Sequence, residues 1–207
     1  MSAQVNPTAQ SVVQSLSGHP LLLMKMQILS LGKNYDVMDE QKNVICKVGL
    51  DSGQNIKGAA IGAAVSQVAG GYIGRFAQRS LTYTYVVRDA QGNPALEIRK
   101  GSGGNKAEFQ IVDPQMNVTL GKIDMKRSLL GGLKASWVAP DGQTYMHSKG
   151  NIIRRKYEII GPSGSSVGRV RHKIMAIRDV WQLELDPQIN HLYSALFATV
   201  LDFEKKM

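Results

Sequence analysis

The sequence predicts a mainly β fold, a closed antiparallel β-barrel around a hydrophobic α-helix at the C-terminal end of the chain. Two observations lead to this prediction. Segments with alternating apolar and polar residues recur along the chain, joined in pairs by short turns. The chain then ends on a segment that would be apolar or small on every face of a helix.

Five hairpins are predicted from the alternation. A period of two is typical of half-buried strands, and the intervening Asp, Gly, Pro and Asn residues favour tight reversals. The hairpins cover residues 35–48, 83–99, 108–123, 135–149 and 156–173, with further strands over 21–29 and 180–185. A long antiparallel meander exposes its edge strands unless it closes, so a barrel is expected.

Residues 187–204 are predicted to form the core helix. Asp186 is a suitable N-cap, and Pro187 suits the first turn. A helix that is apolar or small all round is buried in protein or in lipid. The uncharged run from Leu192 to Leu201 is much shorter than the ~20 residues that span a bilayer. Burial inside the barrel is therefore the simplest prediction.

The chain divides into a polar N-terminal tail, residues 1–18, and a barrel domain, residues 19–207. A short helix is expected within the tail over residues 11–16. Residues 52–80 form a Gly/Ala-rich insert without alternation, and it carries GxxxG spacing twice. That spacing lets helices approach closely in membranes. The insert is open to three interpretations: a membrane-spanning helix, an interfacial or partner-binding helix, and a loosely packed segment of loop and helix.

The composition indicates which kind of partner and which cellular compartment to expect. The net charge of +9 and the pI of about 9.7 favour an anionic partner, either acidic lipid or nucleic acid, although such charge also serves solubility. Cys46 is the single cysteine, so no intrachain disulfide forms, as expected in a reducing compartment. The first residues lack the pattern of a signal peptide. We therefore expect a cytoplasmic protein, with peripheral association at a membrane as a further expectation.

The strongest candidate site is the basic hairpin near the end of the chain. Residues 147–173 contain seven Lys or Arg residues and one acid, Glu158. With a turn centred on residues 163–164, the opposed pairs are Glu158/Arg169, Lys156/Arg171 and Arg154/Lys173. Like charges opposite each other are destabilising, and an anion would relieve them. The predicted lipid- or phosphate-binding residues are Arg154, Lys156, Arg169, Arg171 and Lys173, and the alternative is a solvated hairpin face.

Enzyme signatures are absent from the sequence. No HExxH, CxxC or GxSxG motif occurs, and residues 100–106 lack the order of a P-loop. The acids Glu184, Asp186 and Asp202 are too sparse for a calcium loop. Aromatic residues are few and do not interleave with the basic ladder, so nucleic acid is not favoured as a partner. No catalytic residue, cofactor or metal site is predicted.

Three segments carry a resemblance to a known superfamily. They are MKMQILSLGKNYDVMDEQKNVICKV, GNIIRRKYEIIGPSGSSVGRVRHK and LELDPQINHLYSALFATVLDFE, at residues 24–48, 150–173 and 183–204. The pattern resembles the tubby C-terminal-like superfamily, which includes LURP-one-related proteins and phospholipid scramblases. The resemblance implies a barrel of about twelve strands around a central helix. It also raises the expectation of a phosphoinositide ligand, without assigning binding residues.

Three functions remain open from the sequence. The first is a non-enzymatic binding module that contacts anionic phospholipid through the basic hairpin. The second is a scramblase-like protein that moves lipids between leaflets. The third is a soluble scaffold whose insert, residues 52–80, binds a protein partner.

Overall fold

The structure is a computed structural model of the chain. It describes residues 5–27, 34–51, 82–101, 106–127, 133–151, 156–174 and 179–186. The predicted core helix over 187–204 and the insert over 52–80 lie outside these residues.

The described residues contain one helix and twelve strands. They are α1 (Pro7–Leu16), β1 (Leu21–Met26), β2 (Tyr35–Met38), β3 (Val44–Leu50), β4 (Tyr83–Asp89), β5 (Pro94–Lys100), β6 (Lys106–Asp113), β7 (Val118–Arg127), β8 (Leu133–Val138), β9 (Thr144–Asn151), β10 (Lys156–Ile160), β11 (Ser166–Ile174) and β12 (Asp179–Leu185).

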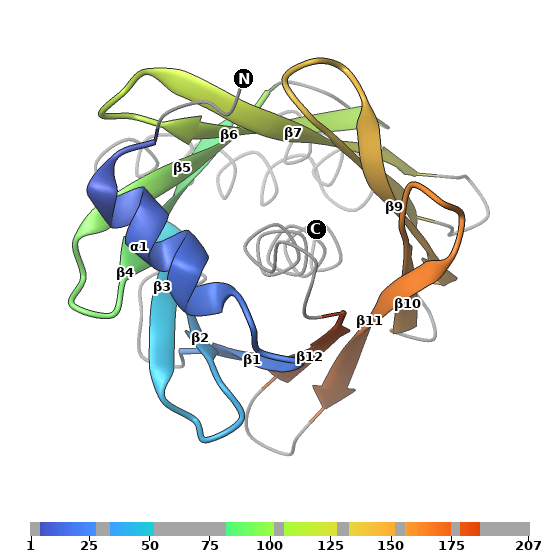
Figure 1. Cartoon of the computed structure of the whole chain (residues 1–207), viewed down its shortest axis with the longest axis horizontal. Helices are drawn as coiled ribbons and strands as arrows, with labels where there is room; N and C mark the ends of the chain where they lie inside the picture. Colours follow the sequence, from blue (N-terminus) through green and yellow to red (C-terminus); the bar gives the residue numbers. More distant parts are fainter. Residues whose placement is uncertain are drawn as a thin grey trace, which may run out of the picture.

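The strands form a closed antiparallel barrel, as predicted (Figure 1). Each strand pairs with its neighbour in the sequence, and β1 pairs with β12 to close the sheet. The five predicted hairpins correspond to β2–β3, β4–β5, β6–β7, β8–β9 and β10–β11. The helix that the structure describes is at the N-terminal end, whereas the sequence placed the principal helix at the C-terminal end.

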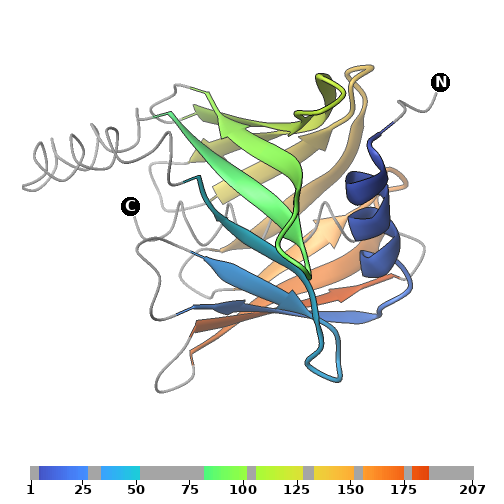
Figure 2. The ribbon, with the colours of Figure 1, turned by 90° about the vertical axis from the view of Figure 1, so that its left-hand side faces the viewer.

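The antiparallel order gives the barrel two distinct ends. The hairpin rim carries the five short turns, residues 39–43, 89–93, 113–117, 139–143 and 161–165. The opposite end, where β1–β2, β3–β4, β5–β6, β7–β8, β9–β10 and β11–β12 are connected, is called the loop rim. Figure 2 shows α1 lying across the hairpin rim.

Two turns of the hairpin rim share one chemistry. In β2–β3 the Asp39 carboxylate accepts hydrogen bonds of 2.8 Å from the backbone and side-chain nitrogens of Asn43. In β4–β5 Asp89 accepts the same two hydrogen bonds from Asn93. The fourth turn residue adopts a positive φ, 69° at Lys42 and 97° at Gly92. Local side-chain chemistry thus sets these reversals.

Helix α1 packs on the barrel against β3, β4 and β5. The short helix expected over 11–16 is present, but it begins earlier, at Pro7, because Asn6 caps it: the Asn6 side chain accepts a hydrogen bond from the Ala9 amide at 2.8 Å. Three residues at helical spacing, Ala9, Val12 and Leu16, are fully buried. This part of the predicted tail therefore contributes to the core.

A buried polar contact fixes the start of α1. The Asp113 carboxylate, at the end of β6, accepts hydrogen bonds of 2.7 Å from the backbone and side-chain nitrogens of Asn6. The Asn6 side chain also donates to the Ala95 carbonyl of β5. Asp113 and Asn6 are 0% and 2% exposed. A buried carboxylate is tolerated because it is fully hydrogen-bonded.

The barrel interior is apolar and aromatic. Alternate residues of each strand point inward, as the period-two pattern predicts. The largest fully buried side chains include Tyr35, Tyr85, Phe109 and Trp181. Trp181, on β12, lies 4.6 Å from the His172 ring of β11 and 6.4 Å from the Tyr157 ring of β10, measured between centroids. The core behind β10–β12 is thus built around this tryptophan.

Cys46 should be unreactive in the folded protein. It is 1% exposed on β3, and burial raises the pKa of its thiol to about 12, with a smaller effect from Asp36. The thiolate is the reactive form, so alkylation by iodoacetamide at pH 8 should be negligible until the chain unfolds. Mass spectrometry with and without urea checks this; rapid alkylation of the native protein would contradict it.

Candidate anion-binding site

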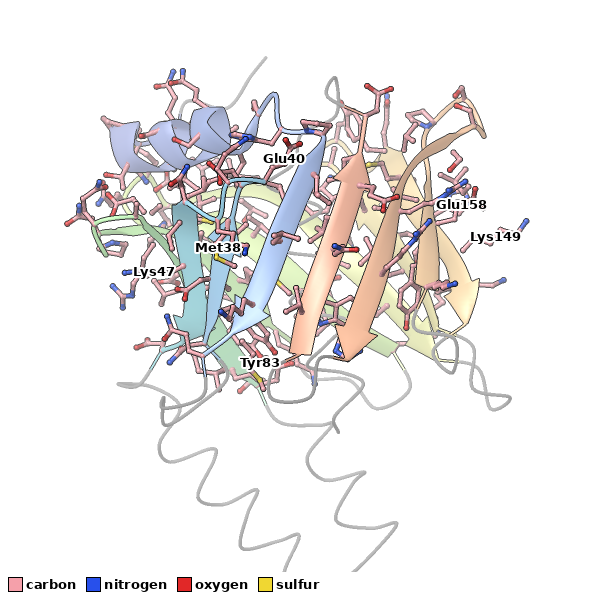
Figure 3. All side chains as sticks on the ribbon, turned by 90° about the horizontal axis from the view of Figure 1, so that it is seen from below. Met38, Glu40, Lys47, Tyr83, Lys149 and Glu158 are labelled. Atoms are coloured by element: carbon pink, nitrogen blue, oxygen red, sulfur yellow. The ribbon has the colours of Figure 1, made fainter. Side chains whose placement is uncertain are left out.

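The candidate site lies on the outer face of β9, β10 and β11. On β10, Tyr157 and Ile159 are buried, so Lys156 and Glu158 point outward. The register places Lys156 opposite Arg171, and Glu158 opposite Arg169. These are the pairs that the turn position predicts. Figure 3 shows Glu158 and Lys149 pointing away from the barrel on the same side.

The outer face is hollowed here. An open depression of about 580 Å³ is lined by Lys149, Gly150, Lys156, Tyr157, Glu158, Arg169 and Arg171. Four of these residues are cationic and one is acidic. Guanidinium groups bind phosphate oxygens in pairs, and lysines add point charges. The depression is therefore suited to a phosphate-bearing ligand.

Gly150 permits the close approach of β9 and β10 in the depression. It lies opposite Tyr157. A Cβ atom on Gly150 would be 2.5 Å from the Lys156 carbonyl oxygen and 2.8 Å from a Tyr157 ring carbon. Any side chain at position 150 would push the two strands apart, so the glycine keeps the cations of β9 and β10 on one continuous surface.

A second acid lies at the edge of the site. Glu184 of β12 is opposite Arg169, and its carboxylate is 3.8 Å from the Arg171 guanidinium. The like-charge pair Lys156/Arg171 is therefore partly compensated by the protein itself. The charge count over residues 147–173 overstated the excess of positive charge at the site. It could not include Glu184, which lies on the next strand, β12. The pair is half-exposed, so its contribution to stability is small.

Not every predicted residue is part of the described site. Lys156, Arg169 and Arg171 are brought together. Arg154 lies outside the described residues. Lys173 is on β11, where its backbone is opposite Val180, but its side chain is outside the description. The structure adds Lys149, which the sequence count included without singling it out.

The metal-ligating and histidine side chains of the described residues near the site do not cluster. Within the described residues, no group of three or more His, Cys, Asp or Glu side chains could hold a metal ion. His147 is exposed on β9 while His172 is buried on β11, so these two histidines lie on opposite faces of the sheet. Among the residues that the structure describes, no helix has the length and apolar character needed to cross a membrane.

The strands define the chain as a closed antiparallel β-barrel protein with a basic outer face. Comparison with known sequences then identifies the family: the LURP-one-related profile matches residues 20–202. The chain therefore belongs to the LURP-one-related family, which is part of the tubby-like C-terminal superfamily. The resemblance inferred from the sequence is confirmed.

A solved structure supports the fold. The chain is similar to an Arabidopsis thaliana protein known from an X-ray structure, with 18% sequence identity and a TM-score of 0.53. The alignment covers 93% of this chain and 96% of that chain. At this identity the likeness concerns the fold alone. No curated protein sequence matches the chain.

Proposed function

We propose that the chain is a non-enzymatic binding module that contacts anionic phospholipid headgroups, including phosphoinositides, through the basic outer face of β9–β11. The observation that carries the proposal is the depression in which Lys149, Lys156, Arg169 and Arg171 converge. The net charge of +9 adds long-range attraction to an anionic surface. The proposal places the protein in the cytoplasm, peripherally at a membrane.

The other two functions depend on other parts of the chain. Scrambling would need residues 52–80 or 187–204 to enter lipid, and scaffolding would use residues 52–80. Both segments lie outside the described residues. The proposed headgroup contact instead rests on side chains that the structure describes.

The double variant Lys149→Glu/Lys156→Glu should lose binding to anionic vesicles. Each cation near such a surface contributes about 1 kcal/mol, so the loss of two lowers the partition coefficient by roughly thirtyfold, and the added acids lower it further. Neither lysine forms an ion pair within the described residues. Lys149→Glu places an acid opposite Glu158, whereas Lys156→Glu places one opposite Arg171. These cross-strand effects oppose each other, so the melting temperature should hardly change. Flotation with phosphoinositide-containing vesicles measures the effect.

The matched control is Lys42→Glu/Lys47→Glu. It makes the same change in net charge, and Figure 3 shows Lys47 on the side of the barrel away from Lys149. The control should bind vesicles almost as wild type. Equal binding by both double variants would count against the site, because affinity would then follow net charge alone.

A further inference from the structure

A row of lysines crosses three strands next to the candidate site. Lys106 of β6 is directly opposite Lys126 of β7, and Lys126 is directly opposite Lys134 of β8. All three are exposed. Adjacent strands are ~4.8 Å apart, so these like charges repel one another.

Further along β6 and β7, a neighbouring lysine is neutralised by acids within the protein. Lys122 of β7 lies 2.8 Å from a Glu108 carboxylate oxygen and 3.4 Å from an Asp124 oxygen. These pairs raise the pKa of Lys122 and lower that of Glu108, each chiefly through their shared hydrogen bond. Within the described residues, Lys106, Lys126 and Lys134 have no such ion pair. Their charge is left for an external anion.

The row is continuous with the candidate site. Ser136 of β8 is opposite His147 of β9, and the Ala135 amide donates to the Ser148 hydroxyl at 3.1 Å. Extending this register by two residues brings Lys134 opposite Lys149. The four lysines and the cations of β10–β11 thus form one arc around the barrel.

The two rims differ sharply in charge. Among the two residues of each strand nearest the loop rim, nine are cations and two are acids. The nine are Lys25, Arg99, Lys100, Lys106, Lys126, Arg127, Lys134, Lys156 and Lys173. Lys100 is buried, and the side chains of Arg127 and Lys173 are outside the description. The same count at the hairpin rim gives one cation, Arg88, and three acids, Asp89, Asp113 and Glu184.

The turns of the hairpin rim extend this asymmetry. They add Asp39, Glu40 and Asp141 against a single cation, Lys42. Figure 3 shows Glu40 at the α1 end of the barrel and Tyr83 at the opposite end. The described residues therefore give the barrel a dipole along its axis. In the field of an anionic surface, this dipole turns the loop rim toward the surface.

We infer that the protein docks to an anionic lipid bilayer with the loop rim and the adjoining β6–β11 face against the headgroups, and with α1 facing away. The inference rests on the proposed lipid contact and specifies its orientation and extent. An arc of cations around one end and side of a barrel matches a plane, whereas a nucleic-acid strand follows a groove with stacking aromatic residues. The large exposed hydrophobic side chains of the described residues, Met116 and Tyr145, are both near the hairpin rim.

Two site-specific probes test the orientation. Gly101→Cys places a thiol at the loop rim, where a Cβ atom makes only an ordinary 3.8 Å contact with the Glu108 carbonyl. Gln91→Cys places one in an exposed turn of the hairpin rim. Cys46 stays in place because it is buried. With a fluorophore on each thiol and a quencher on the lipid headgroups of anionic vesicles, we expect severalfold stronger quenching at position 101 than at position 91.

A charge variant tests the lysine row. Lys126→Glu/Lys134→Glu should weaken binding to the same vesicles by roughly tenfold or more, with Lys42→Glu/Lys47→Glu as the matched control and melting temperatures as the check on folding.

The outcomes separate the two proposals. If wild type floats with anionic vesicles but quenching is equal at the two positions, or Lys126→Glu/Lys134→Glu binds like the control, this docking orientation is wrong and the lipid contact stands. If wild type binds no anionic vesicle, or binds an RNA oligonucleotide instead, both proposals are wrong.

Discussion

Replacing Asp113 by alanine should lower the free energy of unfolding by about 3–5 kcal/mol. The buried carboxylate accepts hydrogen bonds from two nitrogens of Asn6 and from the amides of Gln115 and Met116. Alanine would leave these donors without their acceptor and detach the start of α1 from the barrel. Urea denaturation followed by circular dichroism measures the change.

The matched control is Asp141→Ala, in the turn between β8 and β9. Asp141 accepts one hydrogen bond, from the Gln143 amide, and is exposed. Its replacement should cost well under 1 kcal/mol. A similar small cost at Asp113 would show that the Asn6–Asp113 contact does not hold α1 in place.

The Asp113 contact should also shape the stability at acid pH. Burial raises the pKa of Asp113, but the hydrogen bonds from Asn6, Met116 and Gln115 outweigh burial and hold the pKa below its ordinary value of 3.8. Its contribution to stability is therefore complete above pH 3.8 and is lost as the pH falls through the lower folded-state value. Asp113→Ala should make the free energy of unfolding less dependent on pH in this range.

Replacing Trp181 by alanine should cost about 3–5 kcal/mol, the usual range for emptying a large buried aromatic site. Trp181 is fully buried and packs beside His172 and Tyr157, behind the basic face. The cavity would loosen the strands that carry Lys156 and Arg171, so lipid affinity should fall together with stability. Thermal melting and flotation measured on one preparation check both effects.

Trp181→Phe is the conservative comparison, since it keeps an aromatic ring in the barrel. It should retain most of the stability and full vesicle binding. Full stability in Trp181→Ala would mean that this side chain does not organise the core behind the site.

The barrel could be predicted because each hairpin is specified by residues close together in the sequence. Each hairpin combines alternating strands with a turn whose chemistry sets the register, as at Asp39 and Asn43 or Asp89 and Asn93. The same reasoning gave the correct pairing of Lys156 with Arg171 and of Glu158 with Arg169. Closure followed from the need to cover edge strands.

Contacts between hairpins were beyond local reasoning. The register of Lys126 against Lys134, and of Glu184 against Arg169, depends on strands joined by connections without an alternating pattern. A count of charge along the chain therefore missed both the lysine row and the compensating acid. The docking of α1 through Asn6 and Asp113 was missed for the same reason, because these residues are 107 positions apart.

The most direct test of the central claim is flotation of the wild-type protein with neutral and phosphoinositide-containing vesicles at low and high salt. The account predicts binding to the anionic vesicles alone, and weaker binding as salt screens the basic face. Equal binding to neutral vesicles, or binding that salt does not weaken, would contradict it.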